Sequence, residues 1–78
     1  MEWRNRITID SAVCHGRPCV RNTRIMAAVI LDNLASGQDA QEILRSYPGL
    51  QALDIAAVMA YAADLARDPV LSFPAGAN

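Results

Sequence analysis

The cysteine, histidine and carboxylate side chains of this chain are too few and too scattered to predict a catalytic or metal site. Cys14 with the adjacent His15, and Cys19, supply at most three ligands, and no second pair completes a zinc site. Neighbours on an extended segment point to opposite sides, which disfavours Cys14 and His15 as a nucleophile pair. Gly16-Arg17-Pro18 is too short to cradle a phosphate. We therefore predict a protein that is not an enzyme and needs neither metal nor cofactor, with both cysteines reduced near a loop.

Arginine is the charged residue most unevenly placed along the chain. Residues 1–24 hold five Arg against two acids, a net charge of +3, whereas residues 25–78 hold two Arg against six acids, a net charge of −4. Arginine contacts carboxylates and phosphates in a bidentate manner. The five side chains either form surface ion pairs with the acidic remainder or grip a nucleic-acid backbone. They are Arg4, Arg6, Arg17, Arg21 and Arg24.

The rest of the sequence, which must position these arginines, predicts one mainly α-helical domain. Asp39 and Glu42 form a capping box that starts a short helix, Pro48-Gly49 ends it, and an alanine-rich helix follows. Two helices joined by about four turn residues are typical of a helix-turn-helix unit. In the part of the chain before these helices, β-branched residues and turn-forming residues favour a short strand pair, and Asn22 favours a left-handed turn. The predicted elements are strands at about 7–10 and 18–21, helices at about 26–36, 40–47 and 52–67, and a flexible tail at 68–78.

The last helix is apolar on two sides. At about 100° per residue, one face is the expected core, formed by Ile55, Val58, Met59, Ala62 and Leu65. The opposite side has almost no hydrogen-bonding capacity, so it is a poor reader of base edges, and Gln51 at the helix start is the single candidate reader. An apolar outer side instead favours a homodimer or a partner chain, with the tail folding back as the other possibility. The interface residues expected on this basis are Leu53, Ala56, Ala57, Ala60, Tyr61, Ala63 and Asp64.

Size and composition agree with a small protein that buries surface in a partner. A chain of 78 residues forms one domain, which buries only about 60% of its unfolded surface. Its hydrophobic fraction is 53% and its charged fraction only 19%. No apolar run of about 18 residues could span a bilayer, and no signal peptide is evident, so a cytoplasmic protein with no membrane partner is expected.

From about Ile7 to Ala66 the chain resembles the bacterial family called domain of unknown function 433. Asn22 stands where Gly is usual, which suggests that another residue keeps the left-handed turn. Gln51 stands where Thr or Ser is usual, so the last helix has a weak N-cap, although Asp54 keeps the N3 position. The residues that carry the resemblance are Ile9-Asp10, Gly16 to Ile25, Ala35-Ser36-Gly37, Glu42-Ile43-Leu44 and Tyr47 to Leu50.

The resemblance implies a homeodomain-like or winged helix-turn-helix fold with an N-terminal strand pair. It also implies an antitoxin-like partner of a PIN-like nuclease toxin. Together with the dimer expected from the last helix, this gives an antitoxin-like protein that dimerises, with binding of operator DNA possible. No catalytic residues carry over from the family. In that setting a third role for the arginines is entry into the acidic active site of the nuclease, where a guanidinium would neutralise carboxylates or displace metal. The alternative function is a protein-interaction module with no nucleic-acid role.

Overall fold

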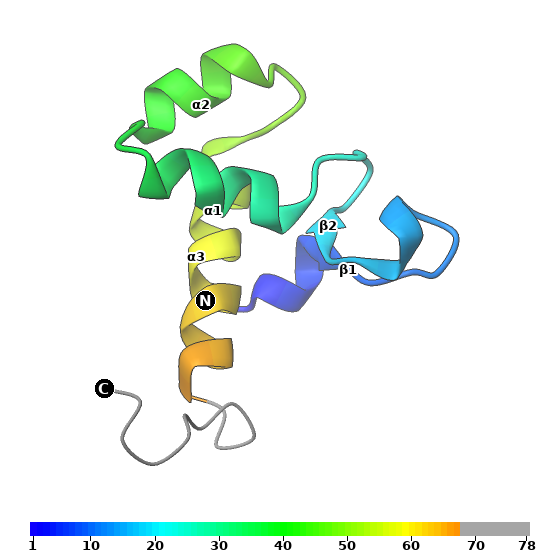
Figure 1. The fold of residues 1–78 in the computed structure, drawn as a ribbon. Helices are drawn as coiled ribbons and strands as arrows, with labels where there is room; N and C mark the ends of the chain where they lie inside the picture. The colour runs from blue at the N-terminus through cyan, green and yellow to red at the C-terminus, as the bar shows by residue number, and fades with distance from the viewer. Residues whose placement is uncertain (68–78) are drawn as a thin grey trace.

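The structure is a computed structural model that describes residues 1–67, a three-helix domain with a small N-terminal sheet (Figure 1). The predicted flexible tail, residues 68–78, lies outside the described residues. The three helices and the strand pair confirm the mainly α-helical architecture expected from the sequence. In chain order the elements are η1 (Trp3–Asn5), β1 (Ile7–Thr8), η2 (Cys14–Gly16), β2 (Cys19–Val20), α1 (Ala27–Ala35), α2 (Ala40–Ser46) and α3 (Ala52–Arg67).

The strand pair is antiparallel and shorter than predicted. Ile7 pairs with Val20 and Thr8 with Cys19. The chain leaves the sheet after Thr8 because the next residues form a turn, in which the Val13 N–H donates to the carbonyl oxygen of Asp10 at 2.9 Å. Pro18, which would stand opposite Ile9 at the same end of the ladder, has no N–H to extend it. The predicted spans of 7–10 and 18–21 are therefore too long by two residues each.

Asn22 makes the left-handed turn that the sequence predicts, with φ at +65°. The following Thr23 fixes that turn. Its hydroxyl donates to the Val20 carbonyl at 2.7 Å and accepts from the Ile25 N–H at 3.0 Å. The chain then enters α1 one residue after Met26, which is the N-cap.

The ends of α1 and α2 follow from local sequence. Gly37, with φ at +100°, lies just past the C-cap of α1, where a left-handed residue is needed. At the start of α2 the Asp39 carboxylate accepts from the Glu42 N–H at 2.9 Å, and the Glu42 carboxylate accepts from the Asp39 N–H at 3.0 Å. This reciprocal pair is the predicted capping box. Both helices lie within about one residue of their predicted bounds.

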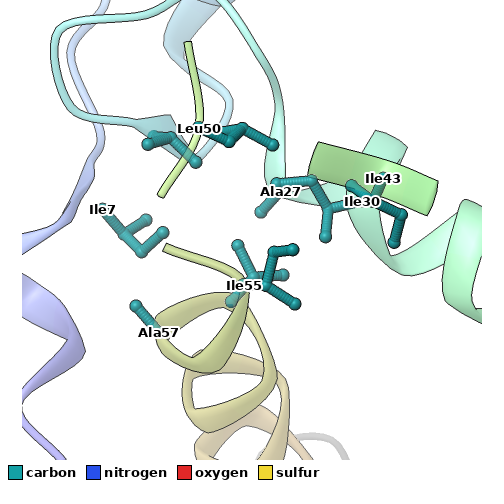
Figure 2. Packing of buried hydrophobic residues seen from close by; sticks show 9 residues of the cluster. Ile7, Ala27, Ile30, Ile43, Leu50, Ile55 and Ala57 are labelled. Carbon is teal, nitrogen blue, oxygen red and sulfur yellow. The ribbon is translucent and has the colours of Figure 1, made fainter. Parts of the chain in front are cut away.

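One hydrophobic cluster joins the sheet to all three helices. Ile30, Ile43 and Val58 have no exposed surface and bring α1, α2 and α3 together. Figure 2 shows Ile7 on the side of the cluster nearer the N-terminal segment, with Ile30 and Ile43 on the opposite side. The buried members are Ile7, Val20, Ala27, Ile30, Ile43, Leu50, Ile55, Ala57 and Val58.

The buried side of α3 differs from the predicted one. Ile55 and Val58 are buried as expected, but Met59 is 48% exposed and Leu65 39% exposed. Ala57, which the sequence places on the outer side, is fully buried. The second half of α3 extends past α1 and α2 (Figure 1, yellow to orange). None of the helices within residues 1–67 is long and apolar enough to cross a membrane.

Candidate binding surfaces

An apolar strip runs along the solvent side of α3, and we call it the outer face of α3. Leu53 is 54% exposed and Met59 48% exposed, while the alanines of the strip are partly buried. Spacings of three and four residues put these side chains on one side of the helix. No charged side chain belongs to the strip. Its members are Leu53, Ala56, Met59, Ala60 and Ala63.

Three residues predicted for this interface serve the inside of the domain instead. Ala57 is in the core. Tyr61 packs edge-on against Trp3 of η1, with ring centroids 4.9 Å apart. The Asp64 carboxylate accepts from the Trp3 indole N–H at 2.6 Å and from Arg67 at 3.0 Å, although Asp64 stays exposed to solvent. The predicted assignment of these three residues to a partner interface is therefore wrong for Ala57, and the other two already have internal contacts.

The contacts that Trp3 makes with α3 are not predicted by any local pattern in the sequence. The Trp3–Asp64 contact spans 61 residues of sequence. No local pattern reports a contact of that range; the only signal was a single tryptophan close to the chain start. The consequence is that η1 covers one side of α3, so the buried side of this helix is turned toward η1.

Arg6 is a structural residue. Its guanidinium lies 3.0 Å from the Asp54 carboxylate, in a pair whose side chains are 29% and 9% exposed, and also donates to the Gln51 side-chain oxygen at 3.3 Å. Asp54 in turn accepts from the Gln51 backbone N–H at 2.8 Å. Asp54 thus caps α3 from the N3 position, as the sequence suggests, and Arg6 ties the N-terminal segment to this helix start. Gln51 is engaged in this network and is not an unoccupied base reader.

Arg4 and Arg21 also have partners within the domain. The Arg4 guanidinium lies 4.4 Å from the Trp3 ring centroid and 3.4 Å from the Glu2 carboxylate. The Arg4 backbone N–H donates to the same carboxylate and lowers the pKa of Glu2. Arg21 donates to the backbone carbonyls of Asn5 at 3.2 Å and of Arg4 at 3.3 Å. Both arginines therefore fasten η1.

Arg17 and Arg24 are different, because both are exposed and their side chains form neither an ion pair nor a hydrogen bond within residues 1–67. Arg24 borders an open polar hollow beside the Asn22 turn, which also contains Arg21 and Asp10. Arg17 borders a smaller, mainly apolar hollow between α1 and α3. Of the five arginines near the N-terminus, these two are the ones whose charged groups contribute to no contact within residues 1–67.

Residues 1–67 place few potential ligands where they could bind a metal ion. Within residues 1–67 no three His, Cys, Asp or Glu side chains come together in a way that could hold a metal ion. His15 is exposed, in a left-handed backbone conformation with φ at +56°. The surfaces that stand out are the outer face of α3 and the two unpaired arginines, and these are suited to binding.

Comparison with known proteins agrees with the fold. The DUF433 family, described as a protein of unknown function, matches residues 7–62. A crystal structure of a DUF433 member protein from Anabaena variabilis ATCC 29413 is similar, with 36% sequence identity and a TM-score of 0.73. The similarity covers 78% of this chain and 60% of that protein's chain, so this chain spans less than two thirds of that protein's length. Among curated proteins no significant match was found.

Proposed function

This chain belongs to the DUF433 family, and we propose that it acts by binding, as an antitoxin-like protein that dimerises through α3 and engages a PIN-like nuclease toxin. The observation that carries the proposal is the outer face of α3. Large apolar side chains at Leu53 and Met59 are half exposed there, on a domain with few charged residues. Contiguous exposed apolar surface on a small protein marks an interaction site.

The order of residues on the outer face suits an antiparallel pair of α3 helices. Alanines let two helix backbones approach closely, and large residues then need small ones opposite. If Ala56 lies opposite Ala63 of a second copy, Met59 lies opposite Ala60 and Leu53 opposite Ala66. Each large side chain meets an alanine in this register. The contact is isologous, as expected for a twofold dimer.

The dimer is tested by placing a charge in the middle of this contact. Ala60→Glu buries a carboxylate without a partner, and we expect the dimer dissociation constant to rise at least about 100-fold. Ala40→Glu is the matched control, since Ala40 is an exposed alanine in the first turn of α2. Sedimentation velocity over a concentration series gives both constants. Equal association of the two variants would contradict a dimer through the outer face.

The toxin contact is assigned to Arg17 and Arg24, the two of the five N-terminal arginines whose side chains form neither an ion pair nor a hydrogen bond within residues 1–67. Nuclease active sites of this kind are rich in carboxylates, which arginine binds in a bidentate manner. We expect Arg17→Ala or Arg24→Ala to weaken inhibition of the PIN-like nuclease partner by about 10-fold or more. Arg45→Ala, at an exposed position on α2, should leave inhibition unchanged. Inhibition that survives both changes would exclude this contact.

Operator DNA is a weaker candidate, because the start of α3 presents Ala52 and Leu53 to solvent while Gln51 is engaged by Arg6. The alternative is a protein-interaction module with no nucleic-acid role. DNA binding through arginine would weaken steeply between about 50 and 200 mM salt, as measured by fluorescence anisotropy. An interaction module would show no such binding.

A further inference from the structure

The two cysteines, which no binding role accounts for, lie at the two ends of one short loop. Cys14 begins η2 and Cys19 lies in β2, five residues later. Cys14 is partly exposed, whereas Cys19 has no exposed surface. One thiol is therefore accessible from solvent and the other is enclosed by the domain.

The fold brings both thiols to the same short segment. The Cys14 thiol donates to the carbonyl of Arg24 at 3.4 Å, and the Cys19 thiol donates to the carbonyl of Thr23 at 3.8 Å. Those two carbonyls belong to consecutive residues. Burial raises the pKa of the Cys19 thiol, and the neighbouring Cys14 thiol raises it further.

The backbone between the cysteines is turned tightly to achieve this. Cys14, His15 and Gly16 are successive left-handed residues, with φ at +52°, +56° and +78°. Left-handed backbone at non-glycine residues is uncommon and costs energy, so a run of this kind is held by its surroundings. Here it folds the loop back, so that Cys14 lies against the segment that also contacts Cys19.

We propose that Cys14 and Cys19 are a site of reversible oxidation, at which a small-molecule disulfide such as oxidised glutathione converts them to an intramolecular disulfide. Cys14 is the attacking residue because it is the accessible one, and Cys19 is the resolving residue. The bond closes the loop that carries Arg17. The proposal does not depend on a dimer or on a toxin.

The reaction is two thiol–disulfide exchanges. The Cys14 thiolate attacks one sulfur of oxidised glutathione, forms a mixed disulfide and releases one glutathione thiolate. The Cys19 sulfur, after losing its proton to solvent, attacks the Cys14 sulfur and releases the second glutathione, which regains a proton. The protein loses two protons and two electrons, and one oxidised glutathione takes them up to become two reduced molecules.

The test is to incubate the reduced full chain with oxidised glutathione, quench it with acid and measure its intact mass. We expect the wild-type chain to end two hydrogen atoms lighter, without an adduct. Cys19→Ala should accumulate a glutathione adduct, because nothing resolves the mixed disulfide, and Cys14→Ser should remain unmodified. A wild-type chain that ends as the glutathione adduct, or a Cys14→Ser chain that reacts as fast as wild type, would overturn the proposal.

A second measurement uses only the wild-type chain, in case a variant fails to fold. The ratio of disulfide to dithiol in a fixed glutathione buffer is measured under native conditions and again in urea. Because the fold holds the two thiols together, we expect the ratio to fall at least about tenfold in urea. An equal or higher ratio in urea would show that the fold does not favour the bond.

Discussion

Truncation of Ile55 to Ala is expected to lower the free energy of unfolding by about 3 kcal/mol, because the side chain is 1% exposed and its loss leaves a cavity between the helices. For a domain of this size that corresponds to a fall in the melting temperature of roughly 10 °C or more. Urea unfolding followed by far-UV circular dichroism measures the change.

The matched control for this truncation is Met59→Ala in the same helix. Met59 is 48% exposed, so its loss in the monomer should cost well under about 1 kcal/mol. The pair tests the rotation of α3, because a helix buried along the sequence-derived stripe would lose similar stability at both positions. Equal losses, measured at low protein concentration, would contradict the observed register.

Asp54→Asn is expected to cost about 2 kcal/mol, the second largest effect. The carboxylate is 9% exposed and joins Arg6 at 3.0 Å to the Gln51 N–H at 2.8 Å. The amide keeps the shape but removes the negative charge, which leaves the Arg6 guanidinium without its ion-pair partner and the positive end of the α3 dipole without compensation. The same urea unfolding measures the loss.

Two comparisons separate the Arg6 contact from a general effect of removing charge. Asp32→Asn changes an exposed aspartate on α1 and should alter stability by less than about 0.5 kcal/mol. In an Arg6→Met background, the cost of Asp54→Asn should shrink by about 1 kcal/mol, since the ion pair is already absent. An unchanged cost in that background would mean that Asp54 acts only as a helix cap.

Local chemistry in the sequence was sufficient for the start and end of most elements. The capping box at Asp39 and Glu42, the left-handed turn at Asn22 and the stop at Gly37 each depend on residues only a few positions apart. Such signals act over one turn of chain and survive in any tertiary setting. The strand ends were less accurate, because a side-chain turn at Asp10 takes the chain out of the sheet.

The rotation of α3 could not be predicted from the sequence with the same certainty. Seven of its sixteen residues are alanine, so both sides of the helix are apolar and periodicity only weakly distinguishes them. Which side of α3 is buried is determined by Trp3, near the other end of the chain, which contacts Tyr61 and Asp64. For that reason Ala57 was placed outside and Met59 inside, the reverse of what the structure has.

The roles of the arginines were equally hard to predict from the sequence. Charge pattern grouped five of them, but their partners are 16 to 48 residues away in the cases of Arg21 and Arg6. Only the fold divides the set into residues that fasten η1 and α3 and residues left exposed. Arg17 and Arg24 emerge as binding candidates from that division, and so does the outer face of α3.

The central claim, that the outer face of α3 holds two copies together, is tested most directly by the mass of the wild-type chain in solution. Sedimentation equilibrium over a range of concentrations should give twice the 8.4 kDa of one chain at the upper end. Dissociation toward 8.4 kDa on dilution would then follow from mass action. A mass of 8.4 kDa at every concentration would contradict the account.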